Sequence, residues 1–324
     1  MSMITRKVSP ALAAGCTVAL KPSEETPLTA LALAELGRRA GLPDGVLNVV
    51  FGDAPAIGAE FAASKAVAKL SFTGSTRIGK LLMRECADTV KKLGLELGGN
   101  APFIVFEDAD IEKAAAGIVA SGFRNSGQTC ICTNRVFCHE AVYERLVAAL
   151  AERVRALRVG NGLDPDVTQG PLITPAAVDK VEEHVRDALA KGARAVVRGA
   201  RPAGAAGNFF EPTVLAGADP SMKVYREETF GPVAPVFRFS DDAEAVAMAN
   251  DTEYGLAAYF YTRDLGRAWR VSEQLQFGMV VNEVAISTPE APFGGWKQSG
   301  LGLEHSKYAL DEFLHKKYVC MGIS

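Results

Sequence analysis

Residues 67–86, VAKLSFTGSTRIGKLLMREC, contain an apolar run, a turn of glycine and small polar residues, and a helical pattern, in that order. The apolar run at 67–72 predicts a strand, and the spacing of apolar residues at 77–86 predicts a helix. The same alternation recurs on both sides, with strands predicted at 17–20, 46–50 and 90–96 and helices at 28–40 and 55–63. Strands joined through helices run parallel, so the sequence predicts an α/β fold with a parallel sheet.

A second cycle of strand and helix begins near Phe103, and it leads into a turn rich in Gly, Asn and Ser before Cys130. The predicted elements are a strand at 103–106, helices at 110–121, 141–157 and 175–191, a helix, strand and helix between 242 and 276, and a strand at 311–320. We expect the boundary between two α/β halves at Gly98-Gly99. The resulting units are 1–97, 98–300 and a C-terminal arm at 301–324.

Composition narrows the class of protein. The chain has 324 residues, of which 48% are hydrophobic, so it is large enough for two domains with buried cores. Its 35 basic and 38 acidic residues are interspersed, which argues against a nucleic-acid partner. The apolar stretches are too short to cross a membrane and the N-terminus lacks a signal-peptide pattern, so the expected location is cytoplasmic.

Cysteine and histidine usage bears on redox state and metals. The six cysteines are irregularly placed, which is typical of reduced thiols rather than of a disulfide scaffold. Cys130 and Cys132 could suggest a metal site, but no second cysteine or histidine pair lies at zinc spacing. The sequence therefore predicts no metal.

The turn NSGQTC at 125–130 places a cysteine after small polar residues. A cysteine attacks as thiolate, which requires partial access and nearby backbone amides, and such a turn supplies both. Taken alone, Cys130 is just as compatible with a small buried side chain, which is the commoner role of a cysteine. Glu96 ends an apolar strand beside two glycines and could be a general base, or a helix cap or ion-pair partner.

Two further segments suit a nucleotide. At Gly74-Ser75 a strand ends and a helix begins, so exposed amides and the helix dipole could hold a pyrophosphate, although any short βα turn can carry glycine. Lys21 and Glu24 follow the strand at 17–20, at the sheet edge where nucleotides bind in α/β folds. Either residue could equally be a solvated surface charge.

These segments, in this order, resemble the aldehyde dehydrogenase superfamily. The resemblance rests on KPSE at 21–24, FTGSTRIG at 72–79, LELGG at 95–99, GQTC at 127–130, EETFGP at 227–232 and PFGG at 292–295. It covers essentially the whole chain. It implies the fold of that family: a partial Rossmann-type cofactor domain at 1–97, a catalytic domain at 98–300, and an oligomerisation strand in the arm at 301–324.

The resemblance also implies roles for individual residues. Cys130 would attack the aldehyde carbon, and the oxyanion would be held partly by the Cys130 backbone amide. Glu96 would deprotonate the water that hydrolyses the resulting thioester. The residues implied in cofactor binding are Lys21, Ser23, Glu24, Gly52, Gly74, Ser75, Leu97, Glu228 and Phe230. The cofactor is expected to be NAD, since Glu24 would repel a 2′-phosphate, while Lys21 leaves NADP open.

Within the family, the likeness is to succinate-semialdehyde dehydrogenases. It rests on MITRK at 3–7, FRN at 123–125, the Cys130/Cys132 spacing, PFGGWKQSG at 292–300 and KYVC at 317–320. It implies that Arg124, Arg6 and Ser287 bind a substrate carboxylate, because arginine offers a planar fork of donors. It also implies that Cys132 forms a redox switch with Cys130, against the simpler interpretation that Cys132 only packs there.

Members of this family carry a further N-terminal segment with an asparagine that completes the oxyanion hole, so the chain is expected to be N-terminally truncated. The stretch 277–282 is one residue shorter than the family pattern, which makes the position of Ser287 less secure. The alternatives are a catalytically impaired remnant or subunit with partial cofactor binding, and a dehydrogenase for glutarate semialdehyde or a neutral aldehyde. A homo-oligomer, dimer or tetramer, is the family expectation.

Overall fold

The computed structural model describes residues 1–197, 199–201, 207–283 and 288–323. The chain folds into two compact units. Unit 1 contains Met1–Glu96 together with residues 288–294 and 300–323, and unit 2 contains the described residues of 97–283 together with 295–299. The boundary thus lies between Glu96 and Leu97. Residues 300–323 are grouped with unit 1.

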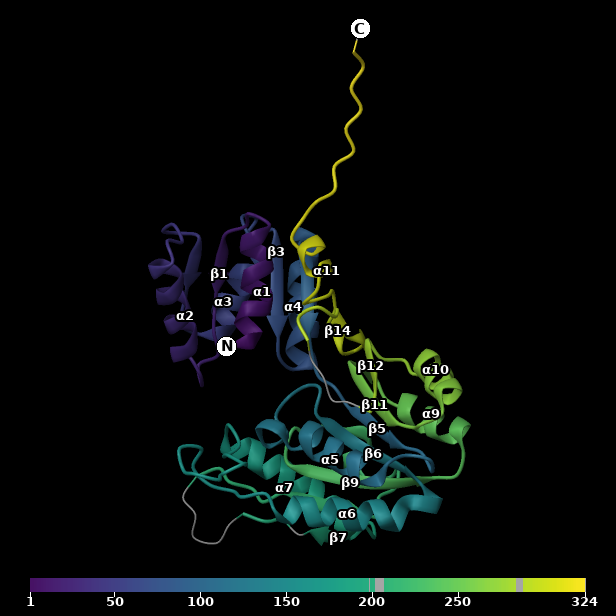
Figure 1. Ribbon diagram of the computed structural model, residues 1–324. Helices are drawn as coiled ribbons and strands as arrows, with labels where there is room; N and C mark the ends of the chain where they lie inside the picture. Colours follow the sequence, from purple (N-terminus) through teal and green to yellow (C-terminus); the bar gives the residue numbers. More distant parts are fainter. Residues whose placement is uncertain (198, 202–206, 284–287, 324) are drawn as a thin grey trace. The chain divides into compact units, whose positions relative to one another are not determined.

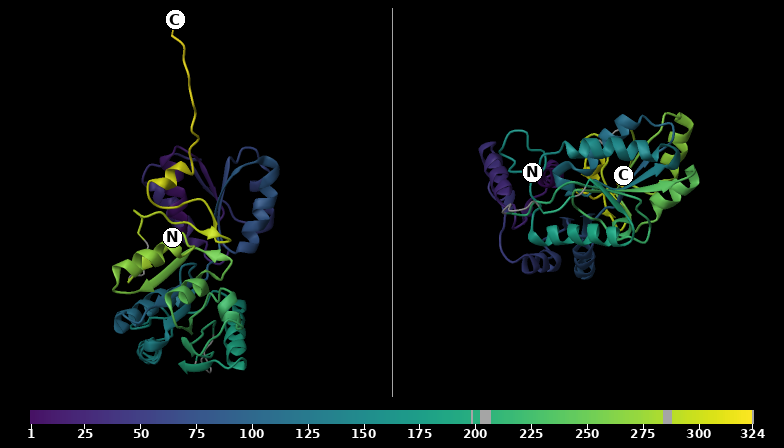
Figure 2. Two further views of the ribbon diagram at one scale, coloured as in Figure 1. Left: turned by 90° about the vertical axis from the view of Figure 1, so that its right-hand side faces the viewer. Right: turned by 90° about the horizontal axis from the view of Figure 1, so that it is seen from below.

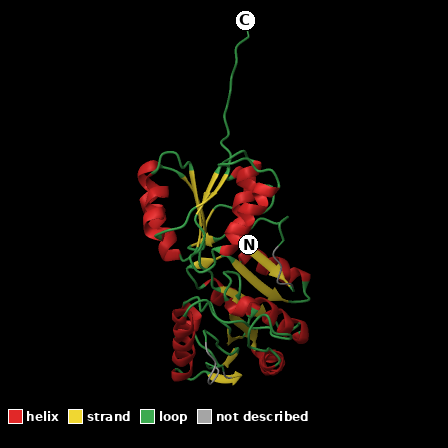
Figure 3. Ribbon diagram, turned by 90° about the vertical axis from the view of Figure 1, so that its left-hand side faces the viewer, coloured by secondary structure: helices red, strands yellow, loops and turns green. Residues whose placement is uncertain are grey.

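Unit 1 has parallel strands between helices, as the alternation predicted (Figures 1 and 3). Strand β1 (Val18–Leu20) pairs with β2 (Leu47–Val49), and β3 (Lys69–Thr73) pairs with β4 (Lys92–Glu96), both in parallel. The helices are α1 (Ser2–Ala13), α2 (Leu28–Arg39), α3 (Ala54–Ala63), α4 (Thr76–Cys86), the 3-10 turn η1 (Ala87–Thr89) and α11 (Tyr308–Asp311).

Polar caps explain where two of these helices begin. The Asp53 side chain accepts a hydrogen bond from the Ala56 amide at 2.9 Å and starts α3. Ser75 accepts from the Ile78 amide at 3.4 Å and starts α4. Helix α4 then buries Leu82 against Leu70 of β3 in a small apolar core. The predicted βα unit at 67–86 is confirmed.

The ends of unit 1 differ from the prediction in two ways. The first residues form α1, which we did not predict because Pro10 and the polar residues before it obscure the helical pattern. The strand expected at 311–320 is wrong. Helix α11 ends at Asp311, and residues 315–323 are exposed without regular structure. A β-strand requires a hydrogen-bonded neighbour, and none of the described residues pairs with this segment.

Unit 2 is built on a seven-stranded sheet in the order β12-β11-β5-β6-β9-β8-β7. Neighbouring strands are parallel except β7, which runs antiparallel to β8. The strands are β5 (Ala101–Val105), β6 (Thr133–His139), β7 (Arg194–Val197), β8 (Thr213–Ala216), β9 (Val233–Phe239), β11 (Ala257–Tyr261) and β12 (Met279–Asn282). The predicted α/β class with a parallel sheet is therefore confirmed.

Helices cover both faces of this sheet (Figures 1 and 2). They are α5 (Ile111–Gly122), α6 (Tyr143–Arg155), α7 (Pro175–Ala190), α8 (Lys223–Arg226), α9 (Asp242–Asn250) and α10 (Leu265–Gln274), with short 3-10 turns η2 (Arg124–Gly127) and η3 (Glu140–Val142). Strands β10 (Tyr254–Gly255) and β13 (Trp296–Lys297) form a separate antiparallel pair, and β14 (Gly300–Leu301) pairs antiparallel with β4 in unit 1.

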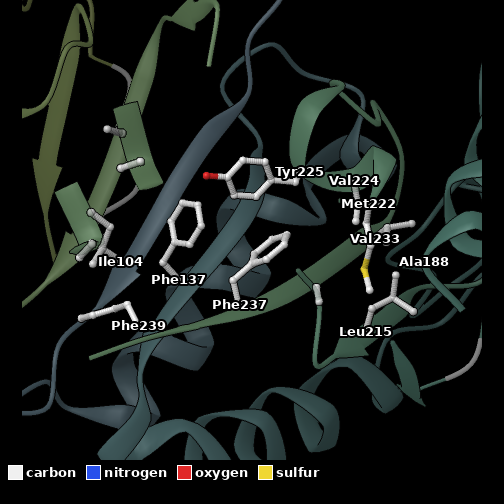
Figure 4. Packing of buried hydrophobic residues seen from close by; sticks show 14 of the residues in the cluster. Ile104, Phe137, Ala188, Leu215, Met222, Val224, Tyr225, Val233, Phe237 and Phe239 are labelled. Atoms are coloured by element: carbon white, nitrogen blue, oxygen red, sulfur yellow. The ribbon is translucent and has the colours of Figure 1, made fainter. Parts of the chain in front are cut away.

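Alternation along the strands separates the two faces. Phe137 lies opposite Ile104 and Phe237 in register, and these side chains pack with α7, α8, α9 and α10 in one buried cluster (Figure 4). On the other face, α5 packs so closely that a Cβ at Gly117 would lie 3.2 Å from the Phe103 ring. The sheet is thus buried on both faces, as parallel sheets require. Among the described residues, no helix is long and apolar enough to span a membrane.

Candidate active site

Cys130 follows a left-handed turn in unit 2. Helix α5 ends at Gly122, and the next residues form η2, in which Asn125, Ser126 and Gly127 have φ values of 52°, 55° and 76°. Residues other than glycine rarely adopt such positive φ values, and contacts with the surrounding structure must offset the conformational cost. The turn returns the chain to β6 and leaves Cys130 partly exposed just before that strand.

Side-chain hydrogen bonds hold this strained turn. The Ser126 hydroxyl donates to the Gly170 carbonyl at 2.9 Å, and the Gln128 side chain accepts from the Ile173 amide at 2.9 Å. The amide groups of Asn125 and Gln128 each donate to the other residue's carbonyl at 3.2 Å. The polar residues that we noted before Cys130 therefore fix the turn itself.

Two glycines allow the backbone to approach Cys130 closely. A Cβ at Gly99 would lie 2.2 Å from the Cys130 carbonyl oxygen, and a Cβ at Gly127 would lie 2.1 Å from the Gly231 carbonyl oxygen. No side chain fits at either position without displacement of the backbone. The structure thus brings together the LELGG, GQTC and EETFGP segments around Cys130, as far as they lie in unit 2.

Cys132 differs from Cys130 in its surroundings. Its thiol is buried, lies 2.7 Å from the Thr129 hydroxyl, and donates to the Arg124 carbonyl at 3.6 Å. Burial raises the pKa of Cys132, which disfavours the thiolate. All six cysteines lie in described parts of the chain and none is in a disulfide.

Glu228 lies beside the same turn. Its Oε1 accepts a hydrogen bond from the Gly99 amide at 3.0 Å. Burial raises the pKa of the Glu228 carboxyl to about 7, against the opposing effects of the Gly99 amide and the Lys180 ammonium. Phe230, two residues later, has a φ of 54° and remains 37% exposed.

A buried polar network that we did not predict supports this segment. Asn134 accepts from the Thr229 amide at 2.9 Å and donates to Asn100 at 2.6 Å, and Asn100 donates to the Tyr225 carbonyl at 3.0 Å. Arg135, buried throughout, donates to the Asn100 carbonyl. The signal in the sequence was the polar start of β6, where Thr133, Asn134 and Arg135 precede the apolar residues of the strand.

Glu96 ends β4 in unit 1 and is 4% exposed. Neither carboxyl oxygen has a hydrogen-bond partner among the described residues. The pKa of Glu96 is raised to about 8, because burial and, after it, the negative charge of Glu304 outweigh the opposing charges of Lys7 and Arg6. A carboxyl with a raised pKa and uncommitted oxygens has the properties of a general base.

Arg6 lies in α1, and its guanidinium has partners within unit 1. It lies 3.5 Å from the Glu304 carboxylate and 4.5 Å from the centre of the Phe293 ring. Lys7 also pairs with Glu304. Arg6 is therefore largely committed to an internal ion pair.

Arg124 lies in η2 and its side chain is exposed. Burial raises the pKa of both Cys132 and Tyr259, and the positive charge of Arg124 acts in the opposite direction. The Tyr259 hydroxyl donates to the Ile131 carbonyl at 2.8 Å, next to Cys130. Ser287 lies outside the described residues.

The residues expected to bind a cofactor follow the C-terminal ends of parallel strands in unit 1. Lys21, Ser23 and Glu24 follow β1, Gly52 follows β2, and Gly74 and Ser75 follow β3. Lys21 and Glu24 form an ion pair at 2.5 Å, which lowers the pKa of Glu24. The Gly74 amide donates to the Glu96 carbonyl at 3.0 Å.

Leu97 opens unit 2, is buried, and donates its amide to the Ser299 carbonyl at 2.9 Å. No group of three or more metal-binding side chains is found among the described residues.

Comparison with known proteins identifies the family. The model of the aldehyde dehydrogenase family matches residues 1–319. The chain is 58% identical to the NADP(+)-dependent succinate-semialdehyde dehydrogenase of Escherichia coli (strain K12), over 99% of this chain and 67% of that protein. It is 56% identical to a glutarate-semialdehyde dehydrogenase of Pseudomonas aeruginosa, over 99% of this chain and 66% of that protein.

A solved structure agrees. The succinate-semialdehyde dehydrogenase of Burkholderia pseudomallei matches with a TM-score of 0.97 and 57% identity, over 99% of this chain and 67% of that one. This chain therefore spans about two thirds of the length of the relatives that it matches. It belongs to the aldehyde dehydrogenase family.

Proposed function

We propose that this chain carries the residues for NAD(P)-dependent oxidation of succinate semialdehyde, or a similar short aldehyde with a terminal carboxylate, to the acid. The observation that carries the proposal is Cys130, a partly exposed thiol on a strained turn that Gly99 and Gly231 contact closely. The relatives named as succinate-semialdehyde and glutarate-semialdehyde dehydrogenases support the substrate class.

The chemistry assigned to Cys130 begins with attack on the carbonyl carbon. The thiolate forms a C–S bond, and the negative charge moves to the former carbonyl oxygen, which the Cys130 backbone amide stabilises. NAD(P)+, when bound, would accept the aldehyde hydrogen together with its two electrons as a hydride, while the charge on the oxygen returns to form the carbonyl. A thioester on Cys130 results.

Glu96 is assigned the second half of the reaction. It takes a proton from a water molecule, the water oxygen attacks the thioester carbon, and the C–S bond breaks to return the thiolate and release the acid. The raised pKa and the two oxygens without hydrogen bonds support this assignment, because a base must be free to accept a proton.

The residues present fit a dinucleotide. Helix α4 begins at Thr76 with Ser75 as its cap, and a Cβ at Gly74 would lie 2.4 Å from the Phe72 ring, so a larger residue there would have to displace that ring. Ser23, Gly52, Leu97 and Phe230 are assigned to line the same cofactor, and Glu228 to hold the nicotinamide ribose hydroxyls. Glu24 favours NAD and Lys21 tolerates NADP, the cofactor that the name of the Escherichia coli relative carries.

Arg124 is assigned to the substrate carboxylate. Its side chain is exposed and its charge acts on groups next to Cys130. Arg6 and Ser287 complete the proposed set, although Arg6 would have to exchange its ion pair with Glu304 for the substrate. The alternatives, a neutral aldehyde or cofactor binding without turnover, are distinguished by the experiment below. A homo-oligomer and a cytoplasmic location are part of the proposal.

The test is NAD(P)H formation from succinate semialdehyde by the purified, reduced protein. Glutarate semialdehyde and an uncharged aldehyde of equal length are compared, and Cys130→Ala is set against the matched control Cys132→Ala. We expect turnover that Cys130→Ala abolishes and Cys132→Ala retains, with preference for the carboxylated aldehydes. Cofactor binding without turnover in folded protein would refute the enzymatic proposal and favour a non-catalytic subunit.

A redox switch between Cys130 and Cys132 is the remaining proposal for this site. The burial of Cys132 and its raised pKa oppose rapid oxidation. Intact-mass measurement after treatment with peroxide tests it. Loss of two hydrogens in the wild type but not in Cys132→Ala would support the switch, and oxygen addition to Cys130 alone would refute it.

A further inference from the structure

The segment Glu227–Gly231 is held on one side by helix α7. Lys180 donates from its ammonium to the Glu228 carbonyl at 2.5 Å. The Val181 side chain would lie 2.2 Å from a Cβ at Gly231. His184, one turn further along the same face, reaches the two residues that flank Glu228.

The contacts of His184 specify which ring nitrogen carries the hydrogen in its neutral form. Nε2 lies 3.3 Å from the Glu227 carboxylate, and Nδ1 lies 3.1 Å from the Thr229 hydroxyl. An ionised carboxylate only accepts, so Nε2 must carry the hydrogen and donate to Glu227. In the neutral ring Nδ1 then accepts from the Thr229 hydroxyl. Both His184 and Thr229 are 1% exposed, so water cannot easily replace the bond between them, whereas the Glu227 carboxylate is 54% exposed.

We propose that neutral His184 is a positioning residue for Glu228, because it ties Glu227 and Thr229 to α7 and so holds the Glu228 carboxylate at the Gly99 amide. This inference rests on the proposed role of Glu228 in cofactor binding. The opposite side of the segment is already fixed by Asn134, which binds the Glu227 carbonyl and the Thr229 amide. His184 supplies the matching support from the helix.

Charges around the ring favour the neutral form. Burial lowers the pKa of His184, the ammonium groups of Lys180 on α7 and Lys223 on α8 lower it further, and Glu227 acts in the opposite direction. Glu183, which precedes His184 on α7, pairs with Lys223. Protonation at acid pH would make Nδ1 a donor, so the bond would reverse: the Thr229 hydroxyl would accept from Nδ1, and its own hydrogen would lose the acceptor that the neutral ring supplies. The support for Glu228 should therefore weaken at acid pH.

The first readout does not involve the cofactor. Nitrogen NMR of protein labelled in its four histidines, with His184 assigned by its loss in a variant, should show a neutral ring protonated at Nε2 at neutral pH. Hydrogen exchange of the peptide containing Gly99 should accelerate when His184 is replaced, because the Glu228 acceptor is less well fixed. A ring protonated at Nδ1, or unchanged exchange, would overturn the proposal.

Two conservative variants separate the contacts. His184→Asn places an amide oxygen near the Nδ1 position and keeps an acceptor for Thr229, whereas His184→Gln reaches the Nε2 position and keeps a donor to Glu227. Each should retain the fold and weaken NADPH binding by about threefold to tenfold, the usual effect of one lost hydrogen bond. His315→Gln, the same change at an exposed histidine, is the control and should leave affinity unchanged.

The pH profile completes the test. In the wild type, affinity for NADPH should fall at acid pH as His184 is protonated, and in His184→Gln this part of the fall should be absent. An identical acid limb in both proteins would refute the positioning role. If the wild type binds no NADPH, the proposed role of Glu228 fails, and the exchange measurement at Gly99 still decides whether His184 positions this carboxylate.

Discussion

Glu96 and Glu228 are both buried carboxyls with a raised pKa, but their surroundings differ. The pKa of Glu96 is raised to about 8 and its oxygens accept no hydrogen bond from any described residue. The pKa of Glu228 is raised to about 7, and its Oε1 accepts the Gly99 amide. An unsatisfied buried carboxyl is costly to the fold, whereas a hydrogen-bonded one is oriented.

The difference gives a physical reason for the two separate roles that the resemblance implies for these carboxyls. A carboxyl without fixed donors can take up and release a proton, which suits a base. A carboxyl held by a backbone amide is a fixed acceptor, which suits the binding of hydroxyl groups. The proposed roles of Glu96 in chemistry and of Glu228 in cofactor binding follow from this contrast.

The largest expected effect that tests the contrast is on turnover. Glu96→Gln should lower kcat for succinate semialdehyde by about 10²- to 10⁴-fold, because the amide cannot deprotonate water. The first burst of NAD(P)H should remain, since the thioester still forms on Cys130. Rapid mixing measures both quantities. The isosteric change Glu228→Gln is the matched control, and an equal loss of kcat in both variants would remove the distinction.

Stability against pH gives the next largest effect. The pKa of Glu96 in the folded chain, about 8, lies above its ordinary value of 4.5, so the folded state binds this proton more tightly. The stabilisation from protonated Glu96 is fully present below about pH 4.5 and is lost as the pH rises through about 8. The wild type should lose about 2 to 4 kcal/mol of unfolding free energy over this range relative to Glu96→Gln.

Chemical denaturation at pH 5 and pH 9 measures this difference. Glu112→Gln, at a side chain 70% exposed, is the control and should follow the wild type at both pH values. If the unfolding free energy changed by the same amount between pH 5 and pH 9 in the wild type and in Glu96→Gln, Glu96 would be ionised without cost in the fold. That result would contradict the raised pKa.

Local patterns predicted most of the scaffold. The βα units before Glu96 have the expected order because apolar strands and capped helices are encoded within short stretches. Helix α1 was not predicted, and the strand expected at the C-terminal end was wrong. A strand depends on a neighbouring strand that the local sequence does not specify. Residues 300–301 pair with β4 in unit 1, and local sequence patterns do not predict this pairing because the two strands lie far apart in the sequence.

The sequence predicted the residues proposed to react or to bind the cofactor better than the residues that hold them in position. Cys130, Glu96 and Glu228 stand in recognisable motifs, whereas His184 and Asn134 act through contacts made across 45 and 95 positions of sequence with Thr229. A polar residue in a helix or strand shows no distinguishing pattern until its partner is known. For Arg6, the ion pair with Glu304 likewise became evident only in the structure.

A substitution at Gly99, whose amide binds Glu228 and not Glu96, should have an intermediate effect on stability and on the reactivity of Cys130. Gly99→Ala places a Cβ 2.2 Å from the Cys130 carbonyl oxygen, so the turn or the Gly99 amide must shift. We expect a loss of about 1 to 3 kcal/mol in stability and a changed alkylation rate of Cys130. Gly162→Ala is the control, because no atom lies within 4 Å of its added Cβ. Unchanged alkylation in Gly99→Ala would show that this close approach does not position the cysteine.

The smallest effect is expected for Glu228→Gln on cofactor affinity. The glutamine oxygen can still accept the Gly99 amide, so the side chain should stay in place and only the charge is lost. Because the pKa of Glu228 is about 7, the wild-type carboxyl is mostly neutral at pH 6 and mostly ionised at pH 8.5. The affinity of the wild type for NAD(P)H should therefore exceed that of Glu228→Gln by about threefold at pH 8.5 and by less at pH 6, since charge strengthens the hydrogen bonds to ribose hydroxyls. Fluorescence titration at the two pH values measures the ratio. A ratio that does not change with pH would mean that Glu228 binds as a neutral or permanently ionised group, and its contrast with Glu96 would then rest on hydrogen bonding alone.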